Sequence, residues 1–109
     1  DIIDPIFYKY SFDPLATISL ITERAMVSVM SICYDKNSPG ESQKALDCYE
    51  ELFDSLLSAG FIPYRSSTHS MHRLDQGSEV FWDVSRQIKQ VLDPEGIIAP
   101  GRYQPKKRG

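Results

Sequence analysis

The feature that most constrains the fold is a change of hydrophobic period near residue 35. Residues 16–22 alternate apolar and polar side chains, with Ile18 and Leu20 on one face, which is the pattern of a half-buried strand. Residues 25–34 form a second apolar run with apolar side chains on both faces, as in a central strand covered on both sides. Beyond this run the apolar spacing becomes helical, so the sequence predicts an α+β fold.

A helix is predicted after the second run. Ser38 followed by Glu41 indicates a capping box, with Pro39 at the first helical position. The helix should reach about Ala59 and end at Gly60, since glycine is favoured just past a helix C-terminus. Its apolar stripe consists of Ala45, Tyr49, Leu52, Phe53, Leu56 and Leu57.

The flanking segments give weaker signals. Residues 1–14 show no clear period and are expected to be extended or irregular. Residues 61–68 are short and contain Pro63, which predicts an edge strand or an extended segment. Residues 69–77 are expected to be a polar loop, and the basic end from Pro105 to Gly109 is expected to fray.

A second helix is predicted from about Ser78 to Leu92, ended by Asp93-Pro94, because a residue before proline avoids the helical region. Its apolar face consists of Val80, Phe81, Val84, Ile88, Val91 and Leu92. The order strand, strand, helix, strand, helix implies a crossover in a parallel or mixed sheet, with helices packed on one face. About three strands and two helices leave an open face that a missing segment or another subunit is expected to cover.

Length and composition narrow the class of protein. The 109 residues suit one small domain with little margin for a core. The net charge of -3 argues against nucleic-acid binding, and no apolar run approaches the roughly 20 residues that span a bilayer. The start at Asp1 without an initiator Met suggests a fragment, a processed chain or an isolated domain. Cys33 and Cys48 fit no disulfide scaffold or zinc motif and are predicted to be buried free thiols in a cytoplasmic protein.

No catalytic constellation is complete in the sequence. His69 and His72 have a spacing that suits two metal ligands on a helix, but no third ligand is evident, so they are predicted to be solvated and no metal is expected. Ser66, Ser67 and Ser70 lie near them without the sharp turn or oriented base that a serine nucleophile needs.

Two segments carry a stronger indication of a binding site than the rest of the chain. In Gly60-Phe61-Ile62-Pro63-Tyr64-Arg65, a hydroxyl beside a guanidinium could hold a phenolate or a carboxylate, although an extended backbone would point the two side chains apart. The alternative is a structural Tyr64 and a surface Arg65. In the segment from Asp93 to Arg102, turn residues flank an Ile-Ile-Ala core. That segment is either a packed tail or a rigid loop that places Arg102.

These two segments, in this order, resemble the C-terminal region of the vanillyl-alcohol oxidase and p-cresol methylhydroxylase family. That family shows Gly-aromatic-x-x-Tyr-Arg, then a helix, then Asp-Pro-x-x-Ile-[Ile/Leu]-Ala-Pro-Gly-[Lys/Arg]. The stretch from Tyr34 to Pro39 also matches the family's strand end and helix start, so the resemblance extends from about Phe12 to Arg102.

The resemblance implies half of a ferredoxin-like cap domain, with a mostly antiparallel or mixed sheet. Residues 1–93 would be the C-terminal part of the cap, or substrate, domain of an FAD-linked oxidase. Residues 94–109 would be the tail that returns to the FAD-binding domain, which is itself absent from this chain. Tyr64 and Arg65 would bind a phenolic oxygen as phenolate, with Arg65 the catalytic candidate. Arg65 and Arg102 would stabilise negative charge on the reduced flavin.

Two positions depart from the family pattern. Val27 and Ser28 stand where several members carry a His-His pair, one of which can be bonded to the flavin, so a histidine linkage from this strand is excluded. His72 stands where relatives often carry Asp, and no role is assigned to it.

The resemblance implies an FAD-dependent oxidase or dehydrogenase that oxidises a para-substituted phenol or aryl alcohol, with this chain inactive alone. The expected partners are the FAD-binding portion of the same enzyme or of another chain, a small phenolic substrate and further copies of the protein. One alternative is an FAD-linked oxidase of 2-hydroxy acids, whose carboxylate would use the same cations. Another is a non-catalytic ferredoxin-like binding module with Tyr64 and Arg65 on its surface.

Overall fold

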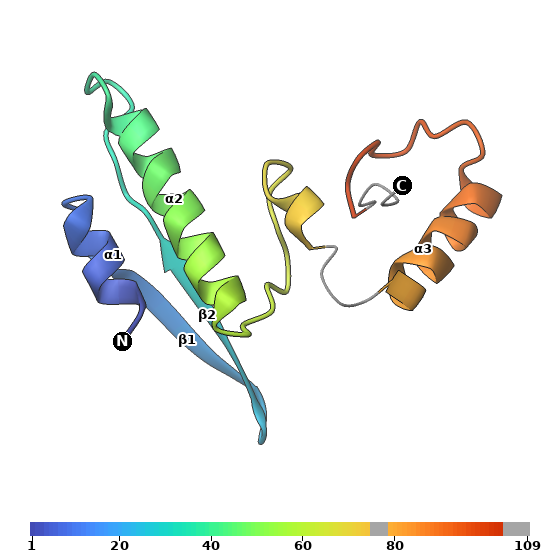
Figure 1. Ribbon diagram of the computed structural model, residues 1–109, viewed down its shortest axis with the longest axis horizontal. Helices are drawn as coiled ribbons and strands as arrows, with labels where there is room; N and C mark the ends of the chain where they lie inside the picture. Colours follow the sequence, from blue (N-terminus) through green and yellow to red (C-terminus); the bar gives the residue numbers. More distant parts are fainter. Residues whose placement is uncertain (75–78, 104–109) are drawn as a thin grey trace. The chain divides into compact units, whose positions relative to one another are not determined.

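The computed structural model describes residues 1–74 and 79–103, so the predictions for residues 75–78 and 104–109 lie outside the described part. The chain forms two compact units, Asp1–Tyr64 and Arg65–Gly109. The elements, in chain order, are α1 (Ile3–Lys9), β1 (Leu15–Thr22), β2 (Ala25–Ser31), α2 (Glu41–Ser58), the 3-10 helix η1 (Met71–Arg73) and α3 (Glu79–Leu92) (Figure 1). Helices with an antiparallel sheet make this an α+β fold, as predicted.

The hairpin of the first unit confirms both predicted strands. β1 and β2 pair antiparallel from Leu15 opposite Ser31 to Thr22 opposite Ala25, with an irregularity between Leu20 and Thr22. The predicted burial is wrong, because every residue of β1 is exposed and β2 is at most half-buried. Over residues 1–74 and 79–103 the sheet has these two strands alone, and Met30 of β2 packs against the core that α1 and α2 form.

α2 ends as the sequence predicted. The backbone N–H of Gly60 donates to the carbonyl of Leu57 at 2.9 Å, and that of Phe61 donates to the carbonyl of Leu56 at 3.0 Å. This is the paired bonding of a Schellman motif, which requires a left-handed residue just past the helix. Gly60 supplies it with φ +86°.

The start of α2 differs from the predicted capping box. The residue before the helix is Gly40, with φ +83°, and Ser38 makes no side-chain cap. Glu41 still reaches backwards, but its carboxylate accepts from the backbone N–H of Asp35 at 2.9 Å. A left-handed glycine therefore makes the entry to the helix, and the carboxylate closes the loop before it.

α1 corrects the expectation of an irregular N-terminal segment. Ile6 and Phe7 are buried and pack with Cys48 and Leu52 of α2, because α1 lies against α2 (Figure 1). A fully buried side chain of this size contributes about 2 kcal/mol to folding. Burial of these two apolar side chains stabilises the helix. Two apolar residues are too few to show a helical period in the sequence.

A polar contact at the rim also joins α1 to α2. One carboxylate oxygen of Glu51 accepts from Lys9 Nζ at 2.6 Å and from the hydroxyl of Tyr10 at 2.8 Å. The hydrogen bond from Lys9, followed by that from Tyr10, lowers the pKa of the Glu51 carboxyl.

In the second unit, α3 confirms the predicted helix, but its buried face differs from the prediction. Trp82 is the buried residue of α3, and its indole N–H donates to the carbonyl of Leu74 at 3.2 Å. The six apolar side chains that were predicted to be buried are between 49% and 80% exposed. Residues 61–68 form no strand, so the predicted strand–helix–strand crossover is not formed in the described part of the chain.

Candidate functional site

The backbone bends at Tyr64 and at Arg65, in place of the expected extended segment. Tyr64 is the last residue of the first unit and is 58% exposed. Arg65 opens the second unit and is also exposed.

Three serines after Arg65 form a hydroxyl cluster, in which Ser66 and Ser70 are buried and Ser67 is exposed. The Oγ atoms of Ser66 and Ser70 lie 2.6 Å apart, and those of Ser67 and Ser70 lie 3.1 Å apart. Ser66 is 8% exposed and Ser70 is 0% exposed, beside the buried Met71. Buried hydroxyls that bond one another are satisfied, so this cluster is a structural support of the Arg65 segment.

Tyr103 joins the C-terminal segment to this cluster. The backbone N–H of Ser66 donates to the Tyr103 hydroxyl at 3.3 Å, and the backbone N–H of Tyr103 points to the sulfur of Met71 at 2.9 Å. Arg65 precedes Ser66, and Arg102 precedes Tyr103. The hydrogen bond between Ser66 and Tyr103 therefore joins the two residues that directly follow Arg65 and Arg102. These are the two arginines that were predicted to stabilise the reduced flavin.

A second polar network organises the segment before Arg102. The carboxylate of Asp93 accepts from the backbone N–H groups of Ile97 and Ile98, each at 3.0 Å, and from Lys89 Nζ. Lys89 Nζ also donates to the carbonyl of Ile98 at 2.8 Å. These four residues, Lys89, Asp93, Ile97 and Ile98, are termed the Asp93 network.

The Asp93 network explains why the signature segment has its sequence. Asp93 is only 7% exposed, and a buried carboxylate needs charged or N–H partners. The hydrogen bond from Lys89, followed by those from the two backbone N–H groups, lowers the pKa of the Asp93 carboxyl. Gly96, with φ +66°, permits the turn that brings these N–H groups round to the carboxylate.

The contact between Tyr103 and Ser66 and the Asp93 network were not predicted from the sequence. Aspartate followed by proline and then glycine is a turn signal that could have indicated the role of Asp93. No local signal marks Tyr103, because its partner lies 37 positions away in the chain.

The cysteines and histidines form no metal site in the part of the chain that the structure describes. Cys48 is buried, as predicted, but Cys33 is exposed and lies two residues beyond the end of β2. His69 and His72 are exposed, as predicted. Among residues 1–74 and 79–103, no group of three or more His, Cys, Asp or Glu side chains is arranged to hold a metal ion.

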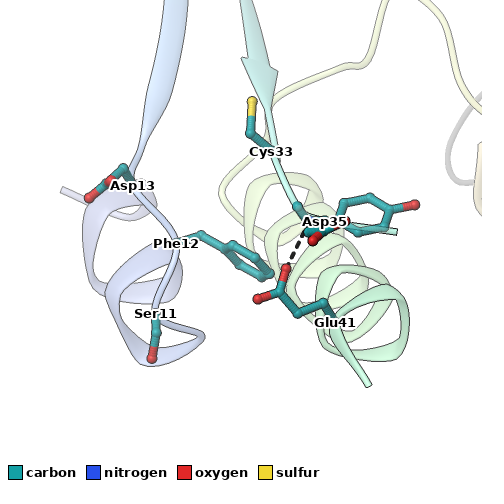
Figure 2. Close-up of a pocket in the computed structure, with 7 residues that line it drawn as sticks. Ser11, Phe12, Asp13, Cys33, Asp35 and Glu41 are labelled. Atoms are coloured by element: carbon teal, nitrogen blue, oxygen red, sulfur yellow. Dashed lines mark hydrogen bonds between the residues drawn. The ribbon is translucent and has the colours of Figure 1, made fainter. Parts of the chain in front are cut away.

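A separate open cavity of about 450 Å³ lies in the first unit (Figure 2). Its lining includes Asp13, Asp35 and Glu41, with Cys33 at one side. Three carboxylates line this cavity, and none of its described lining residues has a cationic side chain, so it suits neither a phenolate nor a phosphate. None of the predicted site residues lines it.

Comparison with known proteins identifies relatives of the chain. Residues 25–103 match the family described as FAD linked oxidases, C-terminal domain. The 1'-carboxy-chondrochloren decarboxylase of Chondromyces crocatus is 36% identical over 94 residues, which are 86% of this chain and 17% of that protein. The 4-cresol dehydrogenase [hydroxylating] flavoprotein subunit of Pseudomonas putida is 33% identical over 98 residues, 89% of this chain and 19% of that protein.

The chain thus spans less than a fifth of the length of these relatives. No solved structure matches it. No helix in the described ranges is long and apolar enough to cross a membrane.

The cofactor of the matched family is FAD. Two arginine side chains of the second unit suit one part of FAD, the edge of the flavin that becomes anionic on reduction. Arg65 and Arg102 are exposed, permanently charged, and attached to residues that hydrogen-bond each other. Two such cations suit the anionic edge of a reduced flavin.

Proposed function

Because this chain belongs to the family of FAD-linked oxidases through their C-terminal domain, we propose that the whole protein is a flavin-dependent oxidoreductase of the vanillyl-alcohol oxidase and p-cresol methylhydroxylase type. Its substrate in this proposal is a para-substituted phenol or an aryl alcohol. The observation that carries the proposal is the Tyr64-Arg65 pair, followed by a segment that the Asp93 network and Tyr103 hold in a fixed form.

Each site residue has a role in this reaction. Tyr64 and Arg65 bind the phenolic oxygen and keep it deprotonated, since a hydroxyl donor and a guanidinium both favour the anion. A phenolate releases hydride from its benzylic carbon more easily than a phenol, because the remaining electrons delocalise into a quinone methide. Bound FAD supplies the hydride acceptor. Arg65 and Arg102 add fixed positive charge where negative charge develops, the arrangement that lowers a barrier without reorganisation.

The proposal includes the domain roles expected from the sequence. Residues 1–93 form the C-terminal part of the cap domain, and residues 94–109 form the tail that returns to the FAD-binding portion. Exposed apolar side chains on β1 and α3 support a partner surface here, among them Leu20 at 78% and Val91 at 80%. The partners are the FAD-binding portion, on the same or another chain, and further copies of the protein.

A second candidate reaction is decarboxylation. The relative at 36% identity is named a decarboxylase, and a carboxylated substrate would find the same cations at Arg65 and Arg102. The two reactions differ in whether the product has lost carbon dioxide.

The experiment is an anaerobic titration of the full-length protein with a 4-alkylphenol, with a 2-hydroxy acid and a 3-alkylphenol as controls. Flavin bleaching by the 4-alkylphenol alone supports the proposal, because a para alkyl group, unlike a meta one, has its benzylic carbon conjugated with the phenolate oxygen. Bleaching by the 2-hydroxy acid instead would place the enzyme among the hydroxy-acid oxidases. Release of carbon dioxide from a carboxylated phenol would favour the second candidate.

A further inference from the structure

Arg102 is held on both sides along the chain. Its own backbone N–H donates to the carbonyl of Ala99 at 3.1 Å, which closes a turn. The next residue, Tyr103, is bonded through its hydroxyl to Ser66 and through its N–H to Met71. A backbone fixed in this way does not have to be ordered when the Arg102 side chain meets a ligand.

The backbone of this turn is in an unfavourable conformation that its contacts maintain. Ala99 has φ +43° and Tyr103 has φ +50°, values that residues with a Cβ adopt at a cost. Strain of this kind persists where surrounding contacts determine the conformation, and it is common near functional sites. The contacts of Tyr103 with Ser66 and Met71 are the ones that can maintain it here.

The residues that Tyr103 contacts are buried, and Ser66 lies in a hydrogen-bonded cluster. Ser70 is fully buried, Met71 is 3% exposed, and Ser66 is bonded into the hydroxyl cluster at 2.6 Å. Arg65 is attached directly to this support. The hydrogen bond that the Ser66 N–H donates to the Tyr103 hydroxyl therefore fixes the C-terminal turn against the Arg65 segment.

We propose that Tyr103 is a positioning residue, which holds Arg102 beside Arg65 so that both guanidinium groups face the same edge of the flavin. The proposal rests on the proposed function, because it requires that the two arginines act on FAD. Tyr103 acts through Arg102 and touches neither substrate nor cofactor. Tyr103→Phe keeps the ring and the contact of the Tyr103 N–H with Met71, and removes the acceptor of the Ser66 N–H.

The test measures the reduction potential of the flavin in the full-length holoenzyme for four variants. These are Tyr103→Phe, Arg102→Ala, the double variant, and Tyr8→Phe as the matched control, since Tyr8 is 61% exposed on α1. Positive charge near the flavin favours its anionic reduced form. Arg102→Ala should therefore disfavour reduction about tenfold, which is about 30 mV for a two-electron couple.

Tyr103→Phe should disfavour reduction about threefold, which lowers the potential by about 15 mV, and Tyr8→Phe should leave the potential unchanged. In the Arg102→Ala background, Tyr103→Phe should have no further effect, because a positioning residue acts only through the group that it positions. A purely structural residue would give additive effects in the double variant.

Each other outcome overturns the proposal. A normal potential in Tyr103→Phe, with a lowered potential in Arg102→Ala, would refute the role of Tyr103 and leave the cofactor role of Arg102 standing. Equal effects of Tyr103→Phe with and without Arg102 would assign Tyr103 a structural role alone. An unchanged potential in Arg102→Ala would refute the cofactor role and the role of Tyr103 with it.

Discussion

At the scale of single residues, Arg65 is the residue on which the proposed chemistry depends most. It is exposed, it opens the second unit, and it is attached to the buried Ser66. Its guanidinium carries a charge at every accessible pH, so it can stabilise both a substrate anion and a reduced flavin.

Replacing Arg65 by Ala in the full-length enzyme should cost about 3 kcal/mol of transition-state stabilisation, or about a hundredfold in kcat/KM, the scale of one oxyanion donor. Arg65→Lys should recover part of the loss, because it restores the charge without the planar donor pair. Arg24→Ala, at the exposed hairpin turn, is the matched control. Undiminished turnover in Arg65→Ala would remove the role assigned to this residue.

The two cysteines should differ in reactivity. Cys48 is 0% exposed, and burial, followed by the nearby charge of Glu51, raises the pKa of its thiol. Cys33 is exposed. Because the thiolate is the reactive form, iodoacetamide should label Cys33 in the folded protein and Cys48 only after unfolding.

Peptide mass spectrometry after timed labelling of the full-length protein measures both rates. Equal rates at the two positions in the folded state would contradict the burial of Cys48.

At the scale of elements, α2 shows how far local sequence determines structure. Its C-terminus could be predicted at Gly60, because a left-handed glycine is encoded locally. Its N-terminus could not, because both Ser38 and Gly40 are plausible start signals, and the choice depends on the bond from Asp35 to Glu41.

The Asp93 network should stabilise the end of α3 in a way that depends on pH. The pKa of the Asp93 carboxyl lies below its ordinary value of 3.8, so the folded state favours the charged form. The stabilisation is therefore complete at pH values above 3.8 and is lost as the pH falls through the lowered pKa. Asp93→Asn should lower the thermal midpoint at neutral pH by a few degrees.

The difference in thermal midpoint between wild type and Asp93→Asn should stay constant from about pH 7 to pH 5 and shrink below pH 3.8. Asp83→Asn is the control, because Asp83 forms an exposed ion pair with Arg86 on the same helix, and such pairs contribute little. A difference that grows as the pH falls would show that Asp93 does not act through its charged form.

At the scale of the whole molecule, the apolar surface is distributed differently from what the sequence suggested. The strands β1 and β2 and the helix α3 were all predicted correctly as elements, yet their apolar faces are largely exposed. The spacing of apolar residues in the sequence shows which residues share a face of a helix or strand, but it does not show what covers that face. The same limit applies to the site, since Tyr103 and Ser66 meet across 37 positions through folding alone.

The exposed faces agree with the proposal that a larger flavoprotein surrounds this chain. The chain covers 17% and 19% of the two relatives. In this account the exposed side chains on β1 and α3, such as Leu20 and Val91, are covered by the FAD-binding portion or by another copy.

The most direct test of the central claim is an absorbance spectrum of the full-length protein as isolated, recorded before and after acid precipitation. The full-length protein should show the visible bands of a bound flavin. If the flavin stays with the precipitate, peptide mapping should place its attachment outside residues 1–109, because the strand that holds Val27 and Ser28 has no histidine to link it. A full-length protein without flavin, which also fails to bind added FAD, would contradict the account and favour a non-catalytic binding module.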